Sequence, residues 1–458
     1  MNADIRWDAD LIRRYDQPGP RYLSYPTAAR FDPRVGSYEL HQALRESRRA
    51  ARPLALHAHI PFCANVCHYC ACSKVITKDH GRALPYLERL EREIELIACH
   101  LGHAQAVQQL HLGGGTPTFL SHDELRRLMG TLQQRFHVAD DAELSIEIDP
   151  READWPTMGL LRELGFNHIS VGVQDLDPAV QRAINRMQTF EQTTTVIDAA
   201  RTLQYHSLNI DLIYGLPLQT PDSFAKTVQL IIGQQPDRIS VFAYTHLPER
   251  FKAQRRINAS DLPEPGDRLE MLRTTLEQLT RAGYRHIGMG HFALPHDDLA
   301  MAQEDGSLQR NVLGYTARGD CDVIGLGVSS VSQVGDLYTC NHEDIARYQE
   351  ALDRGQLPTE RGFRCDDDDR RRRYVIQRLM CDFEVDFATF AERFGDRFDQ
   401  CFADCWPMLV QLERDGLICL SAEAMTVLPV GRLLVRSLCR LFDRYAFDEK
   451  VRPYPLVV

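Results

Sequence analysis

Cys63-Ala64-Asn65-Val66-Cys67-His68-Tyr69-Cys70-Ala71-Cys72 is the stretch of sequence around which the fold is organised. Its cysteines are separated by three, two and one residues, and a predicted strand, Leu54–Ile60, ends just before them. Three thiolates on a short loop after a strand can hold three irons of a cubane cluster and leave the fourth iron open to another ligand. We therefore expect Cys63, Cys67 and Cys70 to bind a 4Fe-4S cluster.

Two other interpretations of these cysteines are a structural zinc site and thiols buried as small apolar side chains. Zinc sites are usually built from separated C-x2-C pairs rather than from a triplet. Cysteines that only fill a core are not expected to cluster within ten residues. The spacing favours the iron–sulfur cluster, and Cys72, which is out of register with the triplet, is interpreted as a neighbouring thiol rather than a ligand.

Strands and helices alternate through the chain after residue 54. The predicted strands are 54–60, 107–112, 144–148, 168–173, 208–214, 238–244 and 284–289, and helices are predicted at 84–101, 157–164, 222–232 and 268–282. Ser121 and Glu124 form a capping-box pattern at the start of a further helix. Roughly six or seven successive β-α units imply an α/β fold with a parallel sheet, rolled into a full or partial barrel.

Three regions are predicted along the chain. Residues 1–53 form an N-terminal arm, residues 54–360 form the β/α barrel domain with its cluster, and residues 361–458 form a mostly helical C-terminal domain. In the last region a helix at 402–414, an extended segment at 418–428 and a helix at 431–445 resemble a winged helix. On this acidic chain, we expect a packing or lid role for that domain rather than DNA binding.

The composition is that of an ordinary globular protein, with 44% hydrophobic and 26% charged residues among 458. No apolar run approaches the ~20 residues of a membrane span, and the first eight residues have no signal-peptide pattern. Nine of the 13 cysteines lie scattered outside the loop, which suits a reducing cytoplasm. The net charge of −11 argues against a nucleic-acid partner. The many arginines suit an acidic substrate, although a coding bias explains most of them equally well.

Polar and glycine residues follow several predicted strands, at the edge where such folds place their functional sites. The glycines at 113–115 let a ligand approach backbone N–H groups, and beside an open iron they are expected to cradle the amino-acid end of S-adenosylmethionine. Glu147 is interpreted either as an acceptor for a ribose or ammonium group or as a structural carboxylate. Gln174, Arg186 and Asp211 suit loop salt bridges individually, but together on one rim they predict a pocket.

These motifs resemble a known family. Cys63–Cys70 is similar to the signature of the radical S-adenosylmethionine superfamily. Together with five other segments it makes the chain resemble the oxygen-independent coproporphyrinogen III oxidases, from the arm to the last helix. Those segments are Arg21–Ala28 (RYLSYPTA), His59–Cys63 (HIPFC), Gly113–Thr118 (GGGTPT), Asn209–Pro217 (NIDLIYGLP) and Gly431–Leu434 (GRLL).

The resemblance implies a set of roles. Cys63, Cys67 and Cys70 would ligate the 4Fe-4S cluster, and Gly114 and Glu147, with Val331 nearby, would hold one S-adenosylmethionine. A second molecule would be bound by Gly115, Thr116, Gln174, Arg186, Asp211 and Thr245. The reaction would oxidatively decarboxylate two propionates of coproporphyrinogen III, giving protoporphyrinogen IX for haem biosynthesis. The resemblance also implies a cytoplasmic monomer with an electron donor such as flavodoxin or ferredoxin.

Three positions depart from the family pattern. His57 stands where the family usually has a tyrosine beside S-adenosylmethionine, Gly290 replaces an aspartate, and Leu112 replaces an aromatic residue. These departures leave two alternatives open, a divergent paralogue acting on another tetrapyrrole and a haem chaperone of the same superfamily. The N-terminal arm and the residues Arg186 and Asp211 favour the enzyme. A winged-helix regulator with a redox-sensing cluster is disfavoured by the negative charge and the barrel.

Overall fold

The computed structural model describes residues 5–17, 19, 20, 22 and 24–446. The described chain forms two compact units, each assembled from separate stretches of sequence. The larger unit contains residues 31–275 and 320–364, and the smaller unit contains the described residues up to 30, residues 276–319 and those from 365 onward. The three regions predicted from the sequence, with boundaries at 53 and 360, stay a prediction.

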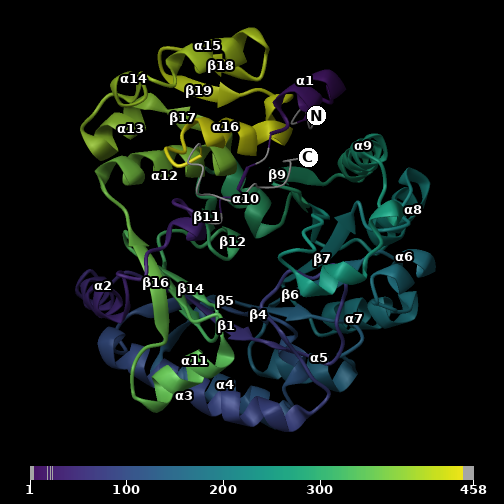
Figure 1. Ribbon diagram of the computed structural model, residues 1–458, viewed down its shortest axis with the longest axis vertical. Coiled ribbons are helices and arrows are strands. Elements are labelled where there is room, and N and C mark those ends of the chain that lie inside the picture. The colour runs from purple at the N-terminus through teal and green to yellow at the C-terminus, as the bar shows by residue number, and fades with distance from the viewer. Residues whose placement is uncertain (1–4, 18, 21, 23, 447–458) are drawn as a thin grey trace. The chain divides into compact units, whose positions relative to one another are not determined.

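One long sheet organises the larger unit (Figure 1). Its strands are β1 (Leu54–Ile60), β4 (Ala106–Gly114), β5 (His137–Ile148), β6 (His168–Gln174), β7 (Ser207–Tyr214), β8 (Arg238–Ala243), β13 (Asp322–Leu326), β14 (Val331–Val334), β15 (Leu337–Asn341) and β16 (Thr359–Arg364). Within this unit they pair in the order β16-β15-β14-β13-β1-β4-β5-β6-β7-β8. All neighbours from β13 to β8 are parallel, as the repeated β-α units predict.

The sequence of β1 explains its central place in this sheet. Leu54, Leu56, Ala58 and Ile60 are completely buried. Strands of a parallel sheet are covered on both faces and are therefore apolar along nearly their whole length. The two histidines of β1, His57 and His59, are the polar exceptions, and both have a pKa below the usual value because burial disfavours the charged imidazole.

Helices cover the outside of these strands. They are α2 (Ser37–Arg49), α3 (Ala83–Leu101), α4 (His122–Arg135), α5 (Trp155–Glu163), α6 (Pro178–Ala183), α7 (Phe190–Thr202), α8 (Pro221–Gly233), α11 (Ile345–Asp353) and the start of α9 (Pro265–Arg281). Figure 1 shows α3, α4, α5 and α7 on one side of the strands. The predicted capping box at the start of α4 is present, because the backbone N–H of Ser121 donates to Glu124 and the N–H of Glu124 donates to Ser121 Oγ.

The sheet continues beyond its parallel part in a way that the sequence does not predict. Strands β14, β15 and β16 extend it from β13 as an antiparallel meander. A parallel crossover is recognised in a sequence by the helical segment between its two strands, and these short strands have no such segment between them. Their periodicity therefore does not show which strand each of them pairs with.

The smaller unit contains many short elements. They are α1 (Ala9–Tyr15), β9 (Arg285–Gly288), β10 (His291–Ala293), α10 (Asp298–Glu304), β11 (Gln309–Asn311), β12 (Gly314–Thr316), α12 (Asp367–Asp382), β17 (Glu384–Asp386), α13 (Phe387–Phe394), α14 (Phe398–Cys401), α15 (Trp406–Arg414), β18 (Ile418–Leu420), β19 (Ala424–Val427) and α16 (Val435–Leu441). Its last part is mostly helical, with one antiparallel sheet ordered β17-β19-β18. Phe390, Phe398, Phe402 and Phe442 pack in its core with edge-to-face or tilted rings.

Two helix boundaries in this unit differ from the prediction. The helix expected at 402–414 begins only at Trp406, because Pro407 fits the first turn of a helix but not its interior. The helix expected at 431–445 is a 3-10 turn, Gly431–Leu434, followed by α16, which ends at Leu441. Arg21 and Leu23 of the predicted arm motif lie outside the described residues.

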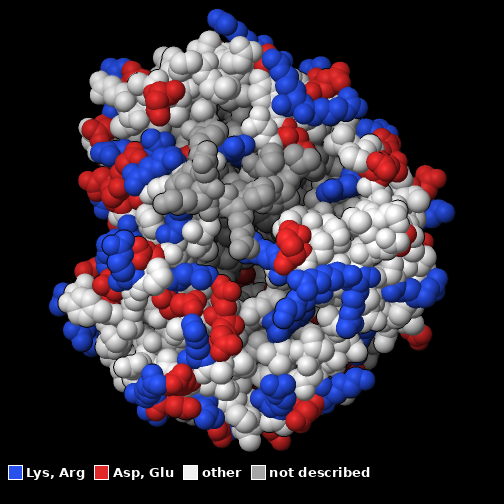
Figure 2. Space-filling model, viewed as in Figure 1, with Lys and Arg blue, Asp and Glu red and all other residues white. Residues whose placement is uncertain are grey.

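None of the helices in the described part of the chain is long and apolar enough to cross a membrane. Charged side chains of both signs are mixed over the face shown in Figure 2. The net charge of −11 is therefore not gathered into one acidic region on that face.

Candidate cofactor site

A cavity of about 220 Å³ lies at the carboxyl ends of the parallel strands in the larger unit. Ten of the residues singled out in the sequence line it: Cys63, Cys67, Cys70, Gly114, Gly115, Thr116, Glu147, Gln174, Arg186 and Asp211. They come from β4, β5, β6 and β7 and from the segments that follow β1, β4 and β6. Parallel strands present their carboxyl ends at one edge of a sheet, which explains why residues more than 140 positions apart meet here.

The cysteine loop is held in place by neighbouring segments. Its start pairs with a short strand, because β2 (Phe62–Cys63) lies parallel to β3 (Val75–Ile76). Its middle is held by two hydrogen bonds, from the backbone N–H of His68 to the carbonyl of Ile184 (2.8 Å) and from Asn185 Nδ2 to the carbonyl of Val66 (2.8 Å). The buried Gln254 donates to the carbonyl of Tyr69 (3.0 Å). The conformation of the cysteine loop is therefore fixed by its contacts with these neighbouring segments.

The three thiols have different surroundings. Burial raises the pKa of Cys63 to about 11, although the hydroxyl of Thr116 donates to its sulfur (3.6 Å). The thiol of Cys72 is hydrogen-bonded to the Cys70 sulfur and, with the charge of Lys74, lowers the pKa of Cys70 to about 6. Cys72 thus contacts a predicted ligand, as expected of a neighbouring thiol. Metal binding requires thiolates, so hydrogen bonds to sulfur favour the binding state.

The glycine loop leaves room that any other residue would fill. A Cβ atom on Gly114 would lie 2.8 Å from the carbonyl oxygen of Ile60, and this glycine has φ +123°. A Cβ on Gly115 would lie 2.6 Å from the carbonyl of Phe62 and 2.9 Å from the Cys63 sulfur. The loop therefore packs directly against the cysteine segment, and only glycine permits this approach.

Glu147 ends β5 at the cavity wall and keeps 47% of its side chain exposed. It accepts a hydrogen bond from the backbone N–H of Gly114 (3.1 Å) and lies 3.7 Å from Nε2 of His111, whose Nδ1 pairs with Ser145 Oγ (2.8 Å). Desolvation raises the pKa of Glu147, but the combined lowering by His111 and the Gly114 N–H is larger. The pKa of Glu147 therefore lies below its usual value. The carboxylate is thus ionised and able to accept further hydrogen bonds.

Asp211 and Gln174 form the opposite wall. Burial raises the pKa of Asp211 to about 6, although Ser170 Oγ and Asn209 Nδ2 donate to it at 2.8 Å. Gln174 has a left-handed backbone (φ 64°), and its buried Oε1 has no hydrogen-bond partner in the described structure. A buried amide oxygen without a partner is costly, so it marks a position where a bound molecule would donate.

Asp149 and Arg151 also line the cavity, and neither was given a role from the sequence. Asp149 accepts hydrogen bonds from Arg186 (2.8 Å) and from Arg151 (2.6 Å), and both guanidinium groups approach the Cys67 sulfur. The sequence feature that could have identified them is their position directly after β5, at the end of a predicted strand. An Asp-Pro-Arg turn is common enough that this signal alone identifies no site.

Three of the predicted site residues are not among the residues that line the cavity. His57 is buried within β1, stacked on His111 at 5.4 Å between ring centroids, and its Nδ1 has no hydrogen-bond partner among the described residues. Thr245 follows β8, where its carbonyl accepts a hydrogen bond from Gln254 (3.1 Å). Val331 begins β14, beside Gly325 of β13. Their expected roles in binding S-adenosylmethionine stay predictions.

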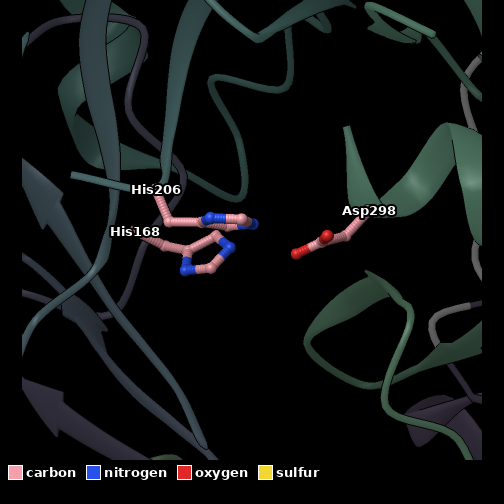
Figure 3. A group of neighbouring side chains, drawn as sticks. All are labelled: His168, His206 and Asp298. Carbon is pink, nitrogen blue, oxygen red and sulfur yellow. The ribbon is translucent and has the colours of Figure 1, made fainter. Parts of the chain in front are cut away.

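A pair of histidines lies at the other end of the strands. His168 begins β6 and His206 precedes β7, and their rings are 5.2 Å apart (Figure 3). The amino end of a parallel strand is remote from its carboxyl end, so this pair takes no part in the cavity. Asp298, also drawn in Figure 3, belongs to the smaller unit, and no metal site is assigned to this group.

Comparisons with known proteins decide the family. Residues 58–231 match the family model "Radical SAM superfamily", and residues 365–434 match "HemN C-terminal domain". The chain is 62% identical over 447 residues to the oxygen-independent coproporphyrinogen III oxidase of Pseudomonas aeruginosa, covering 97% of both chains. It is 44% identical to that of Escherichia coli K12, covering 96% of both. The chain belongs to the oxygen-independent coproporphyrinogen III oxidase family.

Membership of this oxidase family is supported by the fold as well. The solved structure described as coproporphyrinogen III oxidase (HemN) from Escherichia coli, a radical SAM enzyme, superposes with a TM-score of 0.92 at 42% identity, covering 96% of this chain and all of that one. The predicted resemblance and the predicted α/β fold, with a partial parallel barrel and a mostly helical C-terminal domain, are therefore confirmed. The chain is a radical SAM enzyme, and this superfamily works with a 4Fe-4S cluster and S-adenosylmethionine.

The residues of the cavity fit these two cofactors. Three cysteine sulfurs open into one space, which is the donor set of a cluster with one iron left for another ligand. Beside them the unpartnered Oε1 of Gln174 and the carboxylate of Glu147 provide hydrogen-bond acceptors. Sulfur donors and hydrogen-bond acceptors are what a cluster and a charged sulfonium amino acid need.

Proposed function

We propose that this chain catalyses the oxygen-independent oxidative decarboxylation of two propionates of coproporphyrinogen III to vinyl groups, giving protoporphyrinogen IX in haem biosynthesis. The observation that carries the proposal is the convergence of Cys63, Cys67 and Cys70 with the glycine loop on one cavity. Membership of the oxidase family over nearly the whole chain supplies the substrate.

The cofactors supply the difficult chemistry and the protein supplies position. When bound, they would supply radical chemistry, namely hydrogen-atom removal at the β-carbon of a propionate, for a reaction in which the propionate loses CO2 and one further electron to give the vinyl group. Cys63, Cys67 and Cys70 would hold the cluster. Gly114 and Glu147 would hold the amino-acid end of S-adenosylmethionine, since an ionised carboxylate is a partner for its ammonium group.

We also infer that a second S-adenosylmethionine binds in the same cavity. Gly115, Thr116, Gln174, Arg186 and Asp211 also line it, and the orphan amide oxygen of Gln174 is an unused acceptor there. His57, Thr245 and Val331 would support the two molecules from outside the lining. Calorimetric titration of the cluster-loaded protein with S-adenosylmethionine is expected to give a stoichiometry near two, and a value of one would contradict the second site.

Flavodoxin or ferredoxin is proposed as the electron donor, and the proposed state is a cytoplasmic monomer. Both donors are one-electron carriers, as reduction of the cluster requires. Sedimentation of the loaded protein measures the oligomeric state directly.

An anaerobic assay tests the central proposal. The reconstituted protein is incubated with dithionite, S-adenosylmethionine and coproporphyrinogen III. The porphyrinogen products are then oxidised to porphyrins, and their masses are measured by mass spectrometry. We expect loss of one CO2 and two hydrogens at each of two propionates. Cys67→Ala is expected to lose both the cluster absorbance and the activity. Cys99→Ala, which removes an exposed thiol on α3, is the matched control and is expected to keep both.

The other outcomes separate the alternatives. Cleavage of S-adenosylmethionine with intact coproporphyrin would indicate a divergent paralogue with another tetrapyrrole substrate. No cleavage by a fully loaded cluster would overturn the enzyme proposal and favour haem handling.

A further inference from the structure

The sulfur of Cys67 is approached by two arginine side chains. Arg186 Nη1 lies 3.5 Å from this sulfur, and Arg151 Nη2 lies 3.7 Å from it. All three residues are largely enclosed, since Cys67 is 8% exposed and the side chains of Arg186 and Arg151 are 7% and 15% exposed. Charged hydrogen bonds in such surroundings are weakly screened by solvent.

Asp149 ties the two arginines together. Its Oδ2 accepts from Arg186 Nη1 (2.8 Å) and from Arg151 Nη2 (2.6 Å), and its Oδ1 accepts from Arg151 Nε (2.9 Å). Arg186 Nη2 is also anchored to the carbonyl of Gly172 (2.6 Å). Two guanidinium groups and one carboxylate leave one net positive charge beside the Cys67 sulfur. Apart from the Cys67 sulfur, Asp149 is the only side chain of the described residues that accepts from the Arg151 guanidinium, so Asp149 sets where that charge lies.

The other two cluster cysteines have no comparable neighbour. Cys63 accepts from the neutral hydroxyl of Thr116 (3.6 Å). Cys70 accepts from the backbone N–H of Cys72 (3.5 Å), while Lys74 Nζ is hydrogen-bonded to the carbonyls of Cys70 and Cys72 rather than to a sulfur. The three corners of the site are thus unequal: among them only the Cys67 sulfur is contacted by guanidinium groups, whereas Cys70 is contacted by the thiol of Cys72 and lies in the field of Lys74.

We infer that Arg151 and Asp149 act as a pair that sets the reduction potential of the cluster through the Cys67 sulfur. This inference rests on the proposed function, because it requires Cys67 to be a cluster ligand. The step concerned is the uptake of one electron from the donor, with no bond formed or broken. N–H···S hydrogen bonds and positive charge stabilise the added electron, so Arg151 raises the potential and Asp149 limits the rise. Arg151 acts through the sulfur and is therefore a positioning residue.

A redox titration of three variants tests the pair. The reduced cluster is followed by electron paramagnetic resonance while the potential of the anaerobic, reconstituted protein is lowered. For Arg151→Gln we measure the ratio of reduced to oxidised cluster at the midpoint potential of the parent protein. We expect this ratio to fall by about tenfold, the change that corresponds to loss of one charged hydrogen bond. In Asp149→Asn the ratio is expected to rise. Arg151→Lys keeps the charge and is expected to lie between Arg151→Gln and the parent.

Arg162→Gln is the matched control, because Arg162 is a partly buried arginine of the same unit whose side chain donates to the carbonyl of Leu203. It is expected to leave the ratio unchanged. Equal midpoints for the parent, Arg151→Gln and Asp149→Asn at normal iron and sulfide content would overturn the inference. If Arg151→Gln does not load with iron, Asp149→Asn decides alone, and an unchanged or lower ratio overturns it. A parent protein that binds no cluster would instead overturn the proposed function.

Discussion

At the scale of single residues, the position of a side chain along a strand decides whether it reaches the cavity. Glu143 and Glu147 both lie on β5, but only Glu147 reaches the cavity. Glu143 is buried and accepts a hydrogen bond from Gln109 Nε2 (3.0 Å). The same side chain therefore has a packing role at one position and is available to a ligand four residues later.

This contrast gives a prediction for cofactor binding. Glu147→Gln removes the ionised acceptor beside Gly114, so we expect the dissociation constant of S-adenosylmethionine to rise by about tenfold, as for loss of one charged hydrogen bond. Calorimetry on the cluster-loaded protein measures it. Glu143→Gln, the control from the same strand, is expected to leave the constant within a factor of two or so. Equal weakening by the two substitutions would show that Glu147 acts through the strand and not through the ligand.

At the scale of secondary-structure elements, a buried carboxylate holds several elements of the larger unit together. Glu93 of α3 is 1% exposed and accepts three hydrogen bonds. The donors are the backbone N–H of Gly327 after β13 (2.7 Å), Asn341 Nδ2 of β15 (2.6 Å) and the hydroxyl of Tyr348 on α11 (2.7 Å). Burial raises the pKa of Glu93 to about 7, although these donors lower it. The group therefore fixes how α3 and α11 pack beside the antiparallel extension of the sheet.

Replacement of this carboxylate is expected to destabilise the unit strongly. Glu93→Leu leaves three buried donors without an acceptor, so we expect the free energy of unfolding to fall by about 3 kcal/mol or more. Tyr348→Phe removes one donor and keeps the ring, and it is expected to cost about 1 kcal/mol. Urea denaturation of the cluster-free protein, followed by circular dichroism, measures both. A Glu93→Leu protein no less stable than Tyr348→Phe would contradict this account.

At the scale of the whole molecule, each compact unit contains a buried ionisable group whose effect on stability depends on pH. In the smaller unit, burial, and secondarily the charge of Arg432, lowers the pKa of His286 to about 3. Its unfolded value is about 6.5, so between about pH 6.5 and pH 3 only the unfolded chain binds this proton. Stability from His286 is therefore lost as the pH falls through that window. Glu93 has the opposite sign, since its raised pKa weakens folding as the pH rises from about 4.5 to about 7.

The pH dependence gives a third prediction. His286→Leu removes the proton uptake of the unfolded chain at this position. We expect the loss of unfolding free energy between pH 7.5 and pH 5 to become smaller by about 2 kcal/mol, from 1.36 kcal/mol per pH unit. Urea titrations at the two pH values measure the difference. His103→Leu, at an exposed histidine, is the control and is expected to leave the difference unchanged. The same pH dependence in all three proteins would mean that His286 is not the group responsible.

Local patterns in the sequence were sufficient to predict many of the strands and helices. The strand Leu54–Ile60 is observed with those bounds, and the capping box at Ser121 is present, because both depend on residues close together in the chain. The cysteine spacing and the glycine loop are local as well, and the structure brings both to one cavity. Periodicity and spacing determine these features before any distant contact forms.

Tertiary structure alone decided the features that depend on distant segments. The approach of Arg151 and Arg186 to Cys67 joins residues 84 and 119 positions away from the sulfur. The antiparallel extension of the sheet and the assembly of the smaller unit from separated stretches were likewise not predicted. The pairing of β1 with β4 places the ring of His57 on that of His111, a contact that the sequence does not predict. The physical reason is the same in each case: such contacts depend on which distant elements pack together, and no local pattern encodes that choice.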